Sequence, residues 1–206
     1  MFKKNKYTII KQAISKDLAA FVANYFKMQK QVYDTCKASR YFSPFESIIG
    51  YYEGQDEQIP NTYSQYANMA METLLLKCQP GMEKATGLKL YPAYTYARIY
   101  KKGDELKRHK DRFSCEISTT MNLAGDDWPI YLEPSGETGK KGVKVDLKQG
   151  DMLVYSGCEL EHWREKFKGK ECVQVFLHYN NRKTPGSKDN MFDKRPHLGL
   201  PSWFKR

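Results

Sequence analysis

The hydrophobic and polar positions divide the chain into an early helical part and a later part rich in short strands. From Leu18 onward apolar residues return every three or four positions, as on one face of an amphipathic helix. Ser15 is a suitable N-cap for this helix, and Asp17 would lie in its first turn, where negative charge is favourable. The pattern therefore predicts a short strand over Tyr7–Lys11 and then a helix that ends near Cys36.

A second helical pattern runs from about Thr62 to Lys77. Pro80 and Gly81 are expected to break it, and Gly87 is expected to end a short second piece. Beyond this point the apolar runs are short and bounded by turn residues, which is typical of strands. The predicted strands are Leu88–Tyr100, Glu116–Leu123, Pro129–Glu133, Val143–Leu147, Met152–Tyr155 and Glu171–His178. Helices followed by many strands predict an α+β fold, with the helices against one face of a sheet sandwich.

The segment from Ala38 to Asn61 has no regular period and carries several aromatic residues among prolines and glycines. A long loop of this kind often serves as a lid or a binding loop. A pair of strands with ordinary buried aromatic side chains explains the same residues equally well. The sequence leaves both interpretations open.

Composition favours a single globular domain. The chain has 206 residues, of which 40% are hydrophobic, and no apolar run is as long as a membrane helix. The charged residues at the N-terminus are not followed by an apolar stretch, so no secretion signal is expected. The five cysteines are dispersed without Cys-x-x-Cys spacing, which indicates free thiols in a reducing, cytoplasmic compartment.

The net charge of +10 comes from 34 basic and 24 acidic residues. Residues 181–206 hold seven basic and two acidic residues, so half of the excess lies in this last segment. A solvated tail packed over the surface is the favoured interpretation. An acidic or nucleic-acid partner is the alternative, although no base-stacking or groove-reading motif accompanies the charge.

The candidate chemistry begins with His109, Asp111 and the distant His162. Side chains two apart on an extended segment share a face, so a His-x-Asp pair presents an imidazole and a carboxylate together. Two histidines and one carboxylate leave three metal positions open, which is the facial arrangement of non-haem Fe(II) oxygenases. A His-x-Asp triplet alone is weak, because a charged surface turn would have the same sequence.

The surroundings of His162 strengthen the signal. An apolar strand after a turn at Gly150, the run Glu161–Arg164, and Lys170 before the alternating Val173–Leu177 follow in order. Here the chain resembles the prolyl 4-hydroxylase type of 2-oxoglutarate- and Fe(II)-dependent dioxygenases, most of all the compact microbial and phage-encoded members. The resemblance covers roughly Tyr94 to Asn180.

This resemblance implies a distorted double-stranded β-helix, or jelly roll, with the metal at its mouth. Residues 1–206 would form one dioxygenase domain. The N-terminal strand and helices would occupy residues 1–90, the jelly-roll core residues 91–180, and the basic tail residues 181–206.

The resemblance also assigns roles to residues. His109, Asp111 and His162 would bind Fe(II) and serve catalysis. Lys170, at the start of the strand after the distal histidine, would pair with the distal carboxylate of 2-oxoglutarate. Lys166 and Lys168 are neighbouring candidates for the same task.

Two further positions would contact the metal–cosubstrate pocket. Tyr100 lies on the strand that enters the motif, where the family often has a tyrosine, although a core aromatic would look the same. Many relatives carry a second tyrosine on the strand after the aspartate. This chain departs from that pattern, and Thr120 could substitute for the missing hydroxyl.

Three residues are candidates for substrate binding. Arg98 alternates with Tyr96 and Tyr100 on one strand face, so it could bind backbone carbonyls of a substrate. Trp163 could pack a proline ring, and Arg164 follows it at the expected pocket rim. Ordinary rim packing is the competing interpretation for all three.

The function implied by the resemblance is hydroxylation of prolyl residues in a peptide or protein. Fe(II), 2-oxoglutarate and O2 would be required, succinate and CO2 would be released, and a role for ascorbate as reductant is open. The same chemistry on another amino acid or a nucleic-acid base, and a non-catalytic metal- or polymer-binding jelly roll, are alternatives. The setting would be the cytoplasm of a bacterial or phage-infected cell, without membrane association, and the sequence does not give the oligomeric state.

Overall fold

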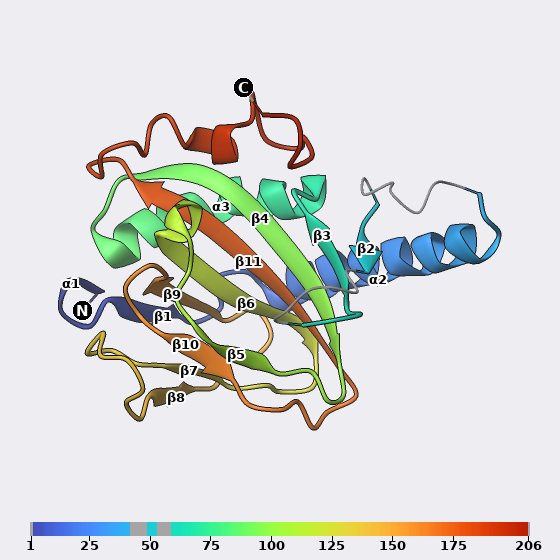
Figure 1. The fold of residues 1–206 in the computed structure, drawn as a ribbon, viewed down its shortest axis with the longest axis horizontal. Helices are drawn as coiled ribbons and strands as arrows, with labels where there is room; N and C mark the ends of the chain where they lie inside the picture. The colour runs from blue at the N-terminus through green and yellow to red at the C-terminus, as the bar shows by residue number, and fades with distance from the viewer. Residues whose placement is uncertain (1, 42–48, 53–58, 206) are drawn as a thin grey trace.

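The computed structural model describes residues 2–41, 49–52 and 59–205, and the strands in these ranges form two antiparallel sheets (Figure 1). In spatial order the larger sheet contains β1 (Tyr7–Ile10), β9 (Met152–Ser156), β6 (Ile117–Gly125), β11 (Glu171–Asn181), β4 (Leu90–Lys101), β3 (Tyr63–Tyr66) and β2 (Tyr51–Tyr52). The smaller sheet contains β5 (Leu106–His109), β10 (His162–Arg164), β7 (Ile130–Leu132) and β8 (Val143–Val145). Apolar side chains of both sheets meet between them, as in a jelly roll.

The helices cover the face of the larger sheet that points away from the smaller sheet (Figure 1). They are α1 (Phe2–Asn5), α2 (Lys16–Ala38) and α3 (Met69–Thr86), and two 3₁₀ turns lie at η1 (Phe113–Cys115) and η2 (Met191–Lys194). Ser15 caps α2, because its hydroxyl accepts a hydrogen bond from the Leu18 amide at 3.2 Å. Val22 and Phe26 on the predicted apolar face are buried against the sheet. The predicted α+β fold with helices on one sheet face is confirmed.

The second helix differs from its prediction at both ends. The residues just after Thr62 form β3, which pairs with β4, and the helix begins only after its N-cap Asn68. Pro80 does not break α3, which continues to Gly87 at a left-handed φ of 73°. Pro80 lies on the exposed side of the helix, so water can bind the Leu76 carbonyl that it leaves without an amide donor.

Two strands of the smaller sheet were not predicted. β5 and β10 have four and three residues, too few to show an alternating pattern. His162 therefore lies on a strand that the sequence pattern did not indicate. In the segment from Ala38 to Asn61, Tyr51 and Tyr52 pair with β3. Most of the segment that was considered as a lid, residues 42–48 and 53–58, lies outside the described residues.

The segment after β11 packs against β4 and α3 and is more than a solvated tail (Figure 1). Arg195 is fully buried, and its Nη2 forms an ion pair with Glu72 Oε1 at 2.7 Å. Part of the basic excess of this segment is thus neutralised inside the protein. None of the helices in the described ranges has the length and apolar character that a bilayer crossing requires.

Candidate functional site

A cavity of about 220 Å³ lies between the two sheets. Tyr94, Tyr96, Arg98 and Tyr100 line one wall because alternate residues of β4 point to the same side. The residues between them face the helices. The remaining lining residues are Leu106, His109, Asp111, Cys115, Ile130, Tyr155, His162, Phe176 and His178.

The structure brings His109, Asp111 and His162 together in this cavity. The two histidines are direct partners across the β5–β10 pair, with ring centroids 4.2 Å apart. The chain turns after His109, so Asp111 Oδ1 lies 3.7 Å from His109 Nε2 and 3.5 Å from His162 Nε2. One ligand atom from each residue lies within 4.8 Å of the other two, as expected for neighbours in one coordination sphere.

Backbone carbonyls fix the orientation of both imidazoles. His109 Nδ1 lies 2.8 Å from the Lys107 oxygen, and His162 Nδ1 lies 3.1 Å from the Leu160 oxygen. A carbonyl can only accept a hydrogen bond, so each Nδ1 carries the proton and each Nε2 keeps a free lone pair. Burial and the neighbouring His162 lower the pKa of His109, which favours this neutral form. The donor set fits a divalent cation.

Asp111 is ionised in this setting. Burial alone would raise the pKa of the Asp111 carboxyl, but the electrostatic environment that the surrounding imidazoles provide, His162 foremost, outweighs it and lowers the pKa to about 2. The Asp111 amide donates to the Gly157 carbonyl at 2.9 Å. A β-carbon at Gly157 would overlap the Asp111 carboxylate and the Cys115 carbonyl, so only glycine leaves the carboxylate its place.

Arg164 is not a rim residue, because only 1% of its surface is exposed. It shares the inward side of β10 with His162 and donates to the Trp128 carbonyl and, at 3.0 Å, to Thr120 Oγ1. Among the described residues no carboxylate pairs with it, and its buried Nε lacks a hydrogen-bond partner. Burial lowers the pKa of Arg164. A buried cation without an anion is costly unless a ligand supplies the negative charge.

Hydroxyl groups surround this cation. Thr120 is fully buried on β6, accepts from Arg164, and donates to Gln174 Oε1 at 2.9 Å. Tyr100 and Tyr155 line the cavity and lie near enough for the charge of Arg164 to act on their phenols, although burial has the larger effect and raises both pKa values. Thr120 thus contacts Arg164, while Tyr100 and Tyr155, the latter missed by sequence reasoning, line the cavity.

Lys170 lies away from the cavity. It is exposed, it is not a lining residue, and its amide donates to Asp126 Oδ2 at 2.6 Å. The structure does not bring Lys170 to the cavity with the three candidate metal ligands. Lys170 precedes β11 at the protein surface, whereas the Arg164 side chain extends from β10 into the interior.

Trp163 likewise does not line the cavity. It lies between His162 and Arg164 on β10, so it points to the opposite, outer side of the smaller sheet. There it stacks on Tyr131 and lies beneath the Arg108 guanidinium, 3.5 Å from the ring centroid. Arg98, in contrast, does line the cavity and donates to Ser64 Oγ at 3.0 Å.

His178, at the end of a predicted strand, is a further histidine that lines the cavity. It is 6% exposed and stacks on Tyr94, and its Nδ1 lies 2.9 Å from Ser118 Oγ. Ser118 Oγ lies 2.9 Å from Asp111 Oδ2. Burial lowers the pKa of His178 to about 4, so this imidazole is neutral near neutral pH.

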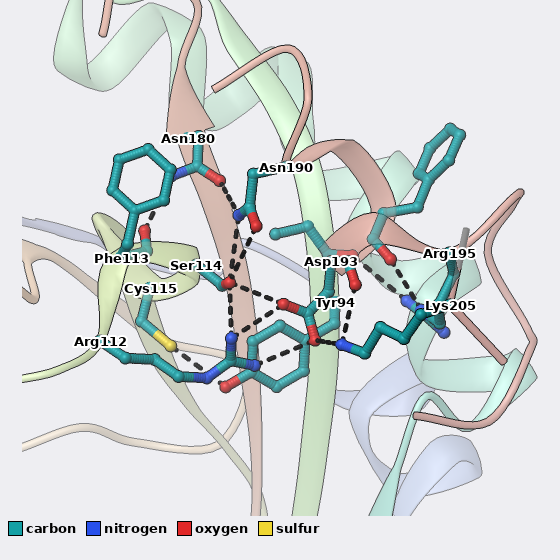
Figure 2. A network of polar contacts seen from close by, with 12 residues as sticks. Tyr94, Arg112, Phe113, Ser114, Cys115, Asn180, Asn190, Asp193, Arg195 and Lys205 are labelled. Atoms are coloured by element: carbon teal, nitrogen blue, oxygen red, sulfur yellow. Dashed lines mark hydrogen bonds and ion pairs between the residues drawn. The ribbon is translucent and has the colours of Figure 1, made fainter. Parts of the chain in front are cut away.

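The C-terminal segment holds the loop that follows Asp111, as Figure 2 shows. Asp193 is buried, pairs with Arg112 at 2.8 and 3.0 Å, and accepts from Ser114 at 2.6 Å and Lys205 at 3.1 Å. These donors outweigh burial and hold the pKa of Asp193 well below its usual range. The backbone is left-handed at Asp193 and at the residue on either side (φ 57°, 56° and 65°), an unusual conformation that these contacts maintain.

No protein-family model and no curated protein sequence matches the chain. Solved structures do. A prolyl-4-hydroxylase from Pseudomonas putida has 15% sequence identity and a TM-score of 0.58, with 88% of this chain and 95% of that chain covered. A prolyl hydroxylase from Trichoplax adhaerens, in complex with a peptide fragment of the hypoxia-inducible factor oxygen degradation domain, has 14% identity and a TM-score of 0.63, covering 88% and 86%.

A third similar structure is SnoN, a non-haem α-ketoglutarate-dependent epimerase from nogalamycin biosynthesis. It has 10% identity and a TM-score of 0.64, with 87% of this chain and 78% of that chain covered. The chain therefore has the jelly-roll fold of the 2-oxoglutarate- and Fe(II)-dependent oxygenases.

Proposed function

We propose that the protein is a 2-oxoglutarate- and Fe(II)-dependent oxygenase. The observation that carries this proposal is the meeting of His109, Asp111 and His162 in one cavity, with both Nε2 lone pairs and Asp111 Oδ1 turned toward one another. Such a set binds Fe(II) and leaves three positions open. When bound, Fe(II) with 2-oxoglutarate and O2 supplies oxidising chemistry that yields succinate, CO2 and a hydroxylated substrate.

The protein's own residues would position the reactants and exclude water. His109, Asp111 and His162 hold the metal. We assign the distal carboxylate of 2-oxoglutarate to Arg164, in place of Lys170. The unpaired, buried guanidinium of Arg164 supports this assignment, because a carboxylate would supply its missing anion and occupy its free N–H groups.

We further propose that the substrate is a prolyl residue in a peptide or protein. Two of the three similar structures described above are prolyl hydroxylases, and one of them holds a peptide. The cavity wall that includes Tyr96 and Phe176 offers aromatic rings on which a proline ring can pack. SnoN has a similar fold and a different activity, so the choice of substrate needs its own experiment.

The test of the chemistry does not require the substrate. Fe(II) and 2-oxoglutarate are added without O2, and the visible charge-transfer band of a keto acid chelated to ferrous iron is recorded. The band should appear with the wild type and disappear in His109→Ala. A folded wild-type protein without the band would refute the proposal.

The test of the substrate uses proline-containing peptides with succinate release and peptide mass as readouts. Substrate-dependent succinate with a gain of one oxygen on proline would support prolyl hydroxylation. A band without any proline-dependent turnover would leave the oxygenase chemistry standing and reject the proline assignment.

A further inference from the structure

The two oxygens of the Asp111 carboxylate have different surroundings. Oδ1 faces the two imidazoles, 3.5 Å from His162 Nε2 and 3.7 Å from His109 Nε2. Oδ2 points away from them and lies 2.9 Å from Ser118 Oγ. The carboxylate therefore presents one oxygen to the proposed metal position, and its other oxygen accepts a hydrogen bond from the Ser118 hydroxyl.

The direction of the hydrogen bonds follows from the donors available. Ser118 has one hydroxyl hydrogen, and its possible acceptors are the Asp111 carboxylate at 2.9 Å and the Cys115 carbonyl at 2.8 Å. The ionised carboxylate is the stronger acceptor, so the hydrogen lies toward Asp111. His178 Nδ1, 2.9 Å from the same hydroxyl oxygen, must then be the donor. The result is a chain of two hydrogen bonds, from His178 to Ser118 and from Ser118 to Asp111, which is called the relay below.

The fold holds both members of this relay. Ser118 on β6 and His178 on β11 are direct partners in the sheet register, and both are buried. The His178 ring stacks on Tyr94 with centroids 4.5 Å apart, and the Tyr94 hydroxyl contacts Cys115 Sγ at 3.1 Å. The relay is thus built into the centre of the larger sheet.

We propose that Ser118 and His178 are positioning residues, which hold Asp111 so that only Oδ1 reaches the metal. The inference rests on the proposed metal site. A carboxylate that used both oxygens would occupy a second coordination position, one that the cosubstrate or O2 needs. Removal of the relay should therefore weaken metal binding and alter the coordination geometry, since partners of metal ligands typically contribute about 10- to 100-fold to affinity or activity.

A purely structural role predicts a different pattern of variants. His178→Phe keeps an aromatic ring to stack on Tyr94 but has no N–H for Ser118. His178→Asn loses the ring but keeps an amide N–H near the position of Nδ1. If stacking is what matters, Phe is the better replacement. If the relay is what matters, Asn is the better replacement.

The experiment measures Mn(II) affinity by calorimetry and the visible spectrum of the Co(II)-loaded protein, with 2-oxoglutarate absent. Ser118→Ala and His178→Phe should each weaken Mn(II) binding about tenfold and change the Co(II) spectrum. His178→Asn should stay within about threefold of the wild type. Thr119→Val is the matched control, because Thr119 is also buried on β6 and accepts a hydrogen bond, at 3.0 Å from the Leu177 amide.

The possible results separate the relay from the metal site itself. Wild-type affinity and an unchanged Co(II) spectrum in Ser118→Ala would overturn the relay while leaving the proposed oxygenase intact. A wild type that binds neither ion would overturn both. If Ser118→Ala does not fold, the comparison of His178→Phe with His178→Asn decides, and better metal binding by the Phe variant would overturn the relay.

Discussion

Replacement of Arg164 by methionine should abolish tight binding of 2-oxoglutarate without unfolding the protein. A guanidinium has five N–H donors, and in this structure one binds the Trp128 carbonyl and one binds Thr120. The remaining donors suffice for a two-pronged contact with a carboxylate. Two charge-assisted hydrogen bonds at about 1.5 kcal/mol each contribute about 3 kcal/mol, so the Kd for 2-oxoglutarate should rise about a hundredfold.

The stability of the ligand-free protein provides a second measurement on the same variant. Loss of one partner from an ordinary buried ion pair costs about 3–5 kcal/mol. Arg164 has no such partner among the described residues, so the loss of its buried hydrogen bonds to Trp128 and Thr120 is partly offset by removal of an unpaired charge, and Arg164→Met should lower the free energy of unfolding by less than about 3 kcal/mol.

The assay is a calorimetric titration of 2-oxoglutarate into the Mn(II)-loaded protein, accompanied by urea unfolding of the ligand-free form. Lys170→Met is the matched control, since this exposed residue should not affect binding. Wild-type affinity in Arg164→Met, or loss of binding in Lys170→Met, would refute the assignment of the carboxylate to Arg164.

Three further changes test other parts of the site. Gly157→Ala places a methyl group against the Asp111 carboxylate, so Mn(II) affinity should fall more than tenfold and the free energy of unfolding by about 1–3 kcal/mol. Unchanged Mn(II) affinity in calorimetry would contradict this packing argument. Asp193→Asn removes a carboxylate with a lowered pKa, whose stabilisation is present above about pH 4 and lost as the pH falls toward the folded pKa. Urea unfolding should thus show a stability gap to the wild type that narrows in acid, and a gap independent of pH would contradict this. Trp163→Ala should lower the free energy of unfolding by about 1–2 kcal/mol, because stacking on Tyr131 is lost. Its kcat/KM for a peptide substrate should stay within twofold of the wild type, and a large loss would indicate that Trp163 contacts the substrate.

The sequence was sufficient for the fold class and for the grouping of the three candidate metal ligands. The helix capped by Ser15 follows from local rules, and the structure agrees with it. His109 and Asp111 could be grouped because residues two apart on an extended segment share a face. The direct pairing of His109 with His162 across β5 and β10 could not be predicted, because neither strand is long enough to reveal its register.

The same alternation of side chains, applied to residues 162–164, predicts the side of the strand to which Arg164 points. A residue two after His162 on a strand must point inward with it, and the residue between them, Trp163, must point outward. That inference requires residues 162–164 to be a strand, and this strand is too short to show an alternating pattern in the sequence. The role of His178 needed tertiary information, since its link to Asp111 runs through Ser118 on a strand 60 residues earlier.

The order of strands in the larger sheet has a consequence for synthesis of the protein on the ribosome. β11 lies between β4 and β6, although it follows both of them in the chain. Until residue 181 has left the ribosome, β4 and β6 each present an unpaired edge, and His178 has not yet reached Ser118. Unpaired edges of this kind promote association between chains. Nascent chains arrested before β11 should therefore depend on chaperones to stay soluble.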